Sequence, residues 1–375
     1  VDPQFIDPAN DDYRLMIGSP AEDTGANNLL DEDDAAVNID YNGDGDLLDE
    51  LTTDLADIGL GRVQGGTVDR GAFETTTFVV DTTADILNFD LSAGDVALRE
   101  AVGAFLSPKR ILFDPALNGA TISMNGTQFD VDNDTFIDAS ALPAGIILDA
   151  NGNSRVMGVG DSSEVVIDNV TLQNGFLASG AGAGLIVDGG SDVLLRDSIV
   201  QDNQILRTTP RANSSETING AGIANRGTLT LERTQVSNNL ASVSISSGTG
   251  PRVQGGGISN EGTLTVRESI ITGNEARTTR GNVEGGGIAA VPTGPALPTG
   301  TLTIENSLIS GNLATGTTSI FAGVAGGLFI FNNDATITNT TISGNRANSN
   351  DPIARPAQGG GLFLDAGGSF TVDMN

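Results

Sequence analysis

Short runs in which apolar residues alternate with polar ones fill much of this chain. Residues 255–274, GGGISNEGTLTVRESIITGN, show the pattern: Leu264 and Val266 alternate with threonines, and Ile270 follows in the run SIITGN. A period of two is typical of β-strands, and Gly, Asn or Ser bounds each run. The sequence therefore predicts short strands joined by tight corners.

Near-copies of this stretch recur with the same internal order, at residues 220–239, 285–312, 326–345 and 359–375. Equivalent apolar residues are separated by 35, 30, 40 and 34 residues: Ile223, Ile258, Ile288, Leu328 and Leu362. One run is too short to bury its own apolar face, so each copy must stack on the next. The predicted fold is all-β, a right-handed parallel β-helix (solenoid) with three short strands per coil.

One corner of the coil is marked by asparagine in four copies. We expect these side chains to form an internal ladder by bonding from coil to coil: Asn239, Asn274, Asn312 and Asn345. The variable length of the repeat falls directly after this corner, in residues 240–253, 275–283 and 313–324. Insertions at one corner line one side of a solenoid, so we expect loops there and ligand binding on that side.

The chain divides into three parts. Residues 1–75 form an acidic, non-repeat segment, residues 76–109 a strand and a short helix, and residues 110–375 the solenoid, open at its C-terminal end. Asp95 is a plausible helix N-cap with Glu100 in the early helix. The expected apolar face of the helix consists of Val96, Leu98, Ala101, Val102 and Phe105. Such a helix can cover the end of the stack, where bare strand edges would invite aggregation.

The acidic segment contains a run that matches a calcium loop. The chain holds 48 acidic and 18 basic residues, and the resulting net charge of −30 opposes binding of nucleic acid. In residues 40–50, DYNGDGDLLDE, oxygen ligands fall at positions one, three, five and seven, with Gly at six. We predict a structural calcium site whose ligands are Asp40, Asn42, Asp44, Asp46 and Glu50. Position twelve is Leu51, so a solvated acidic turn is the alternative.

A second acidic cluster, Asp130, Asp132, Asp134 and Asp138, lies in FDVDNDTFIDAS. The spacing places the first three carboxylates on one face of a strand or in a calcium-binding turn. Three interpretations are open: a second metal site, the acid pair of a glycosidase, or an outward acidic face. In the last case Val131, Phe136 and Ile137 pack inward or against the helix.

Several motifs resemble those of large bacterial surface proteins. DPQFIDPANDDYRL and TVDRGAFE resemble the segment that closes a β-helical module, and DVALREAVGAF resembles the domain named after a Cys-Ser-Leu-Arg-Glu-Ala signature. Val96 and Ala97 stand where that signature has Cys and Ser. The GGGI and SGN repeats are similar to those of polymorphic outer-membrane proteins and related adhesins. The resemblance implies a secreted or surface location and adhesive or structural work.

The composition disfavours the enzymes that use this fold. A polysaccharide lyase needs a base and cations, yet the chain has no His and a single lysine, Lys109. A glycosidase needs stacking platforms, yet Trp is absent and the only tyrosines are Tyr13 and Tyr41. No apolar run has membrane length. We therefore expect a non-enzymatic extracellular structural protein that associates end to end in a filament or stalk. The alternative is an adhesin that binds glycans or other surface proteins through the variable loops.

Overall fold

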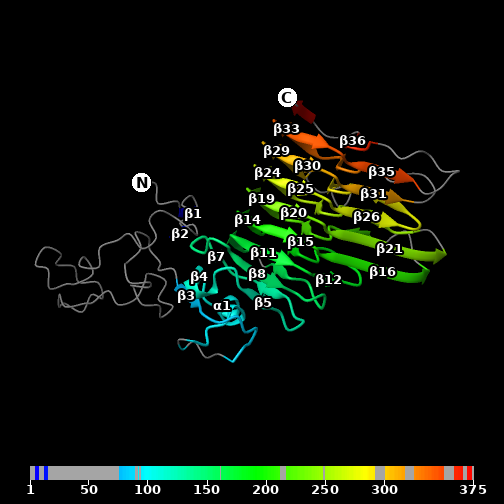
Figure 1. The fold of residues 1–375 in the computed structure, drawn as a ribbon. Helices are drawn as coiled ribbons and strands as arrows, with labels where there is room; N and C mark the ends of the chain where they lie inside the picture. The colour runs from blue at the N-terminus through cyan, green and yellow to red at the C-terminus, as the bar shows by residue number, and fades with distance from the viewer. Residues whose placement is uncertain are drawn as a thin grey trace, which may run out of the picture.

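The computed structural model is a stack of short parallel strands (Figure 1). It describes residues 5–7, 12–15, 76–88, 92, 94–160, 162–211, 217–247, 250–291, 300–316, 325–349, 359–365 and 370–373. Near the N-terminus, β1 (Phe5–Asp7) and β2 (Asp12–Leu15) pair antiparallel. Every other described pairing is parallel, which confirms a parallel β-solenoid over the described residues.

Sheet 1 runs the whole length of the stack. Its ten strands, in order, are β3 (Thr76–Val80), β4 (Lys109–Phe113), β7 (Thr135–Asp138), β10 (Glu164–Asp168), β14 (Asp192–Arg196), β19 (Thr228–Glu232), β24 (Thr263–Arg267), β29 (Thr301–Glu305), β33 (Asp334–Thr338) and β37 (Phe370–Asp373).

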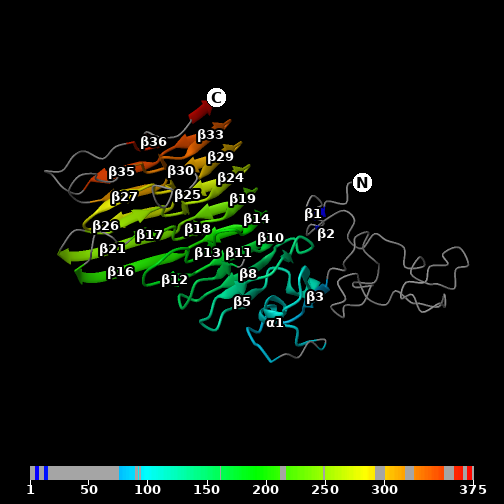
Figure 2. The ribbon, with the colours of Figure 1, turned by 180° about the vertical axis from the view of Figure 1, so that it is seen from behind.

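Two eight-stranded sheets complete a three-sided coil (Figure 2). Sheet 2 consists of β5 (Thr121–Ser123), β8 (Ile146–Asp149), β11 (Val170–Gln173), β15 (Ile199–Gln201), β20 (Gln235–Ser237), β25 (Ile270–Thr272), β30 (Leu308–Ser310) and β34 (Thr341–Ser343). Sheet 3 consists of β6 (Phe129–Val131), β9 (Met157–Val159), β13 (Leu185–Val187), β18 (Ile223–Asn225), β23 (Ile258–Asn260), β28 (Ile288–Ala290), β32 (Leu328–Phe331) and β36 (Leu362–Asp365).

These three sheets, which we call the prism, enclose the main core. Equivalent inward residues of neighbouring strands face each other directly, and in sheet 1 they form a fully buried column: Ile111, Ile137, Ile167, Leu195, Leu231, Val266, Ile304 and Ile337. Burying one such side chain stabilises the fold by roughly 1.5–3 kcal/mol. The predicted register of the repeat is confirmed in sheet 3, where Ile223 pairs with Ile258 and Leu328 with Leu362.

We had predicted loops in the variable segments, but their described residues form mainly strands of a lateral extension with its own core. Sheet 4 consists of β12 (Phe176–Leu177), β16 (Gln204–Arg211), β21 (Leu240–Ser247), β26 (Glu275–Thr278), β31 (Leu313–Gly316) and β35 (Arg346–Ser349). Sheet 5 consists of β17 (Thr217–Asn219), β22 (Arg252–Gln254) and β27 (Asn282–Glu284). The coils that contain β16, β21 and β26 have strands of both sheets, and therefore five described strands rather than three. The segment Leu-Ala-Ser-Val-Ser-Ile forms a strand because Ala241, Val243 and Ile245 alternate and are buried.

The predicted asparagine ladder lies where sheet 2 meets sheet 4, and it includes Asn203 as well. Asn239 Nδ2 donates to Asn274 Oδ1 at 2.9 Å, and Asn274 Nδ2 donates to Asn312 Oδ1 at 3.0 Å. Each amide also donates to a prism carbonyl, as Asn274 does to Val236 O at 2.9 Å. The ladder thereby satisfies buried polar groups where the prism and the extension join.

Glycines of the GGG motif lie directly against this ladder, where a larger residue would not fit. A Cβ on Gly257 would lie 2.9 Å from Asn274 Cγ, and one on Gly256 would lie 2.4 Å from the carbonyl carbon of Glu275. Gly287 stands against Asn312 in the same way. Only glycine allows the chain entering sheet 3 to pass this close to the strands of sheet 4. The glycine run and the asparagines thus form a narrow neck between the two cores.

A hydroxyl ladder that the sequence analysis did not identify lies where sheet 1 meets sheet 2. It is built from Ser198, Thr234, Ser269, Ser307 and Thr340. Ser269 Oγ, for example, accepts from Thr234 N at 3.0 Å and donates to Arg267 O at 2.6 Å. Glu268 before it has a positive φ of 49°, so the strand alternation restarts at this corner. An unbroken alternation from Leu264 and Val266 would direct Ile270 into the core, but Ile271 is buried there instead and Ile270 is 39 % exposed.

The short helix α1 (Leu98–Gly103) lies beside β3, β4 and β6 at the N-terminal end of the stack. Leu98, Ala101 and Val102 contribute to the main core, as predicted. Two expectations about α1 were wrong. Asp95 does not cap it; Glu100 Oε2 instead accepts from Ala97 N at 3.1 Å. Phe105 lies beyond the helix and is 95 % exposed.

Candidate functional site

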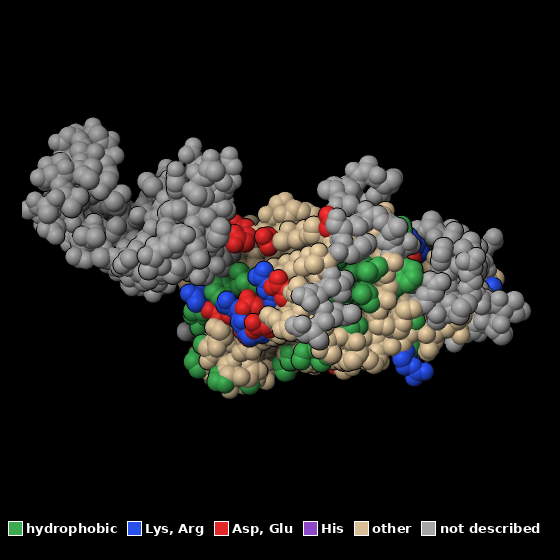
Figure 3. Space-filling view, turned by 90° about the horizontal axis from the view of Figure 1, so that it is seen from above, with side chains coloured by type: hydrophobic (Ala, Val, Ile, Leu, Met, Phe, Trp, Pro, Cys, Tyr) green, Lys and Arg blue, Asp and Glu red, His purple; other side chains and the backbone are tan. Residues whose placement is uncertain are grey.

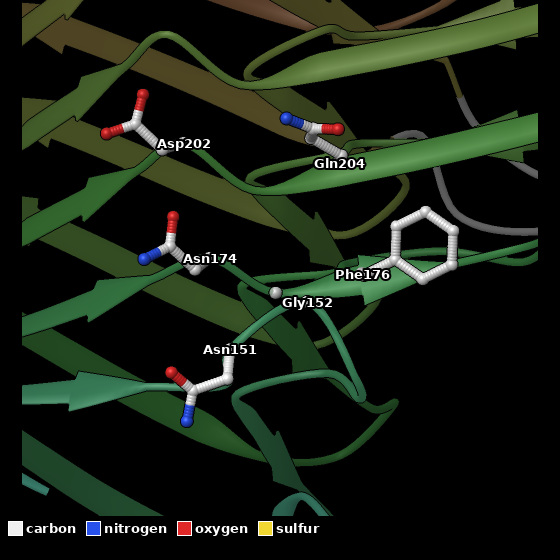
Figure 4. Close-up of a pocket in the computed structure, with 7 residues that line it drawn as sticks. Asn151, Gly152, Asn174, Phe176, Asp202 and Gln204 are labelled. Carbon is white, nitrogen blue, oxygen red and sulfur yellow. The ribbon is translucent and has the colours of Figure 1, made fainter. Parts of the chain in front are cut away.

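A shallow polar pocket of about 230 Å³ lies on the outer corner between sheets 2 and 4 (Figure 4). Its lining residues come from three successive coils: Asn151, Gly152, Asn174, Gly175, Phe176, Asp202 and Gln204. Asn151, Asn174 and Asp202 form a column on one side, and Phe176 and Gln204 lie on the other. The pocket is therefore built by the stacking of coils rather than by a single loop.

The backbone at this corner turns through left-handed residues. The φ values of Asn151, Asn174 and Asp202 are 53°, 55° and 56°. The same position is Gly273 and Gly311 in later coils. Glycine adopts this conformation at less cost than any other residue, and Asn and Asp tolerate it better than most. The coils that form the pocket thus keep polar side chains at this corner, as the next coil does with Asn238, whereas the later coils have glycine there.

Asp149 holds the two asparagines in place. One carboxylate oxygen accepts from Asn151 N at 2.8 Å, and the other accepts from Asn174 Nδ2 at 2.9 Å and from Gln173 Nε2 at 2.9 Å. The side chains of Asp202 and Gln204, in contrast, make no hydrogen bond to any described residue. They are available to a ligand in solvent.

Phe176 provides an aromatic wall. In β12, Leu177 packs against the core of the extension, so Phe176 points to the outer face. Its backbone is fixed because Phe176 N donates to Ser154 O at 2.8 Å, and Gly175 N donates to Asn203 Oδ1 at 2.7 Å. The backbone that carries the ring is thus fixed beside amide and carboxylate groups. Such a site can contact an apolar ligand face and form hydrogen bonds with polar groups at its edge.

The predicted calcium ligands Asp40, Asn42, Asp44, Asp46 and Glu50 lie outside the described residues. The second acidic cluster is described, and the structure separates it. Asp130 lies in β6 and Asp138 in β7, whereas Asp132 and Asp134 lie in the connection between them, so the first three carboxylates do not share a strand face. No three acidic side chains among the described residues converge as metal ligands.

The contacts of this cluster are structural. Arg110 Nη2 donates to Asp138 Oδ2 at 2.7 Å, and Ser140 Oγ donates to Asp138 Oδ1 at 2.6 Å. Burial alone would raise the pKa of Asp138, but these hydrogen bonds outweigh it and leave the pKa below its usual value. Ile137 packs inward as expected. Phe136 was expected inward or against the helix, but it lies on the outer face with the Arg110 guanidinium 5.2 Å from its ring centroid.

The Leu-Arg-Glu-Ala motif of α1 also has a structural role. Leu98 and Ala101 are buried, and Glu100 accepts from the helix start and from Asn88 N at 2.8 Å. Arg99 Nε donates to Asp85 Oδ1 at 2.5 Å, and its other nitrogens donate to the carbonyls of Thr127 and Gln128. Arg99 therefore fastens α1 to the segment before β6, Leu98 and Ala101 anchor it in the core, and Glu100 closes the start of the helix.

Lys109 is buried under α1 and is only 1 % exposed. Its ammonium donates to Val102 O at 2.5 Å and to Ala104 O at 2.7 Å, carbonyls at the C-terminal end of the helix. Burial lowers the pKa of Lys109 to about 8, although Asp132 opposes this shift. No lysine is therefore presented to solvent for ligand binding.

The pocket was not predicted from the sequence because its residues are distant from one another along the chain and lie before the regular copies begin. Asn-Gly at residues 151–152 and 174–175 is an ordinary turn signal. The only available signal was an aromatic residue directly after such a turn, at Phe176.

Comparisons with known proteins identify no relative: no family model, curated protein or solved structure matches the chain. Among the described residues, no helix is long and apolar enough to cross a membrane.

Proposed function

We propose that this chain is a non-enzymatic structural solenoid, a rigid right-handed segment of an extracellular or cell-surface filament or stalk. The observation that carries the proposal is the unbroken register of sheet 1 from β3 to β37, together with polar ladders at the corners. Continuous backbone and side-chain ladders make each coil a direct support for the next. The resemblance to bacterial surface proteins agrees with this role.

Association of copies end to end is part of this proposal, and the apolar surface at the α1 end of the stack supports it. At the end of the stack where α1 lies, Leu87 (52 %) and Phe105 (95 %) are exposed beside the helix residue Val102, and Val79 of β3 is 47 % exposed. We propose that α1 covers part of this end, and that the remaining apolar surface contacts residues 1–75 or a neighbouring copy.

Electron microscopy of the purified chain tests this role. We expect thin fibres whose axial repeat is close to the length of one unit, and loss of those fibres after deletion of residues 1–30. Circular dichroism of the deletion variant should keep its β-spectrum, which separates failure to associate from failure to fold. Fibres of unchanged appearance after the deletion would refute the end-to-end contact.

The acidic residues of the first segment would stiffen it by binding calcium. We expect calcium to raise the melting temperature and to protect residues 1–75 from protease, because oxygen ligands would converge around Gly45. Calorimetric calcium binding should be lost in Asp44→Ala and kept in Asp54→Ala, which changes a nearby acid outside the loop. Binding that survives Asp44→Ala would place calcium elsewhere.

The absence of polysaccharide cleavage is part of the proposal. In the corner pocket Asp202 is the single lining carboxylate, and the oxygens of nearby Asp149 accept hydrogen bonds from Asn151, Gln173 and Asn174. A glycosidase uses a pair of carboxyl groups about 5–10 Å apart. We expect no release of reducing or unsaturated ends from pectin or alginate. Release that disappears in Asp132→Ala or Asp202→Ala would establish an enzyme.

The adhesin alternative is favoured by one observation, the pocket beside Phe176. The variable segments do not offer free loops over the described residues, since they form sheets 4 and 5. Adhesion would therefore use the outer corner of the stack.

A further inference from the structure

We infer that the corner pocket is a binding site for a neutral saccharide, with Phe176 as the stacking platform and Asn174, Asp202 and Gln204 as hydroxyl partners. This inference goes beyond the structural role proposed above and does not depend on it. A solenoid that does not associate end to end would still carry the pocket.

The chemistry of the lining selects this ligand class. A pyranose has an apolar face of C–H groups and a rim of hydroxyls, and aromatic rings pack well against such a face. Carboxamides donate and accept hydrogen bonds, and a carboxylate accepts them, so the column can satisfy hydroxyls in either role. Successive coils are ~4.8 Å apart, which is comparable to the size of one sugar ring. Neighbouring members of the column can therefore contact different hydroxyls.

The charge of the site excludes anionic ligands. No Arg or Lys lines the pocket, Asp202 is acidic, and the whole chain has a net charge of −30. A uronic acid or a phosphate would be repelled without any compensating cation. The same lining is too poor in carboxylates for tight binding of a divalent cation.

The site is preorganised, which reduces the cost of binding. Asp149 fixes Asn174 by the 2.9 Å hydrogen bond to its Nδ2, and Gly152 N donates to Asn174 O at 2.8 Å. Gln204 N donates to Gly175 O at 2.7 Å, so a backbone hydrogen bond joins the two coils that carry Asn174 and Gln204. Asn174 keeps its side-chain oxygen for the ligand.

Calorimetric titration of the full chain tests the inference. The probes are four neutral tetrasaccharides, cellotetraose, maltotetraose, laminaritetraose and mannotetraose, with tetragalacturonate as the anionic comparison. We expect weak binding of at least one neutral probe and none of tetragalacturonate. Phe176→Ala should weaken that binding about tenfold or more, and Asn174→Gly about threefold to tenfold. Both variants should retain the melting temperature within a few degrees, because they change outer-face side chains.

Two matched variants control for indirect effects. Asn238→Gly removes the exposed side chain at the same corner one coil beyond the pocket, where φ is 57°. Leu240→Ala truncates the residue that follows Phe176 and Gln204 in the outer column of sheet 4. Both should bind as the unmodified chain does. The inference would be overturned if none of the neutral saccharides bound. It would also be overturned if Phe176→Ala and Asn174→Gly bound them as tightly as the unmodified chain does. It would also be overturned if calcium, and no saccharide, bound in a manner abolished by Asp202→Asn.

Discussion

The prism and the extension both stack parallel strands around a buried core, but their inward side chains differ in size. The prism core consists mainly of Ile, Leu and Val, whereas the extension carries Ala241, Ala276 and Ala314 in equivalent positions of sheet 4. Small inward residues allow sheets 4 and 5 to approach closely, but each buries less apolar area. The extension should therefore depend more strongly on its hydrogen bonds and on its attachment at the neck.

Ion pairs join neighbouring strands on the outer face of sheet 1. Arg196 Nη2 lies 2.5 Å from Asp168 Oδ2, and Arg267 Nε lies 3.3 Å from Glu305 Oε2, in each case between neighbouring strands of sheet 1. The end-on view shows basic and acidic side chains gathered next to one another (Figure 3). Alternating charges between coils favour the observed register.

The largest expected effect is at the neck, where both regions meet. Asn274→Ala should destabilise the chain by about 4 kcal/mol, because it leaves buried partners on Asn239 and Val236 unpaired. Urea denaturation measures the loss, and hydrogen exchange should show sheets 2 and 4 opening together near this coil. Asn238→Gly, at the neighbouring exposed position, should change stability by less than about 0.5 kcal/mol. Equal effects of the two variants would show that the ladder does not hold the neck.

Truncation of a core side chain should lower the free energy of unfolding more in the prism than in the extension. Leu231→Ala, in the prism, should cost about 3–4 kcal/mol, and Val243→Ala, in the extension, about 2 kcal/mol. Both side chains are essentially fully buried, so the difference measures the size of the contact each one makes. Hydrogen exchange should be faster throughout sheet 5 than in sheet 1. Slower exchange in sheet 5 would reverse the proposed order of stability.

The N-terminal end of the prism, which has no extension beside it, should show a pH dependence of its own. Burial lowers the folded-state pKa of Lys109 to about 8, below the usual value of 10.5, so the unfolded chain binds this proton more tightly. Stability contributed by this group should therefore rise as pH increases from about 8 to about 10.5, by up to about 3 kcal/mol. Lys109→Met should abolish the rise in urea titrations at these pH values. A decrease over this window in the unmodified chain, absent from Lys109→Met, would mean that Lys109 is stabilised in its charged form.

The smallest effect is expected on the outer face of sheet 1. Arg267→Ala removes an exposed ion pair with Glu305 and should cost less than about 0.5 kcal/mol, a loss that added salt should reduce further. Thermal unfolding at low and high salt measures it. A cost comparable to that of Leu231→Ala would show that charge alternation, rather than the apolar column, sets the register.

The sequence by itself determined the solenoid, its register and the asparagine ladder, because a period of two and recurrent Gly and Asn corners leave stacking as the only way to bury short strands. Ile223, Ile258 and Ile288 could be aligned by position alone, and they pair as aligned. The motif around Leu98 also predicted a helix whose apolar residues enter the core.

Only the tertiary structure decided where the strand phase changes and what the variable segments form. The exposure of Ile270 depends on the left-handed turn at Glu268, which has no signature of its own in the sequence. The strands of the extension carry Ala and Ser, whose apolar area is too small to mark a buried face until the neighbouring coils supply the other wall. The corner pocket joins Asn151, Phe176 and Asp202 from three coils, and residues so far apart in the chain come together only when the coils are stacked.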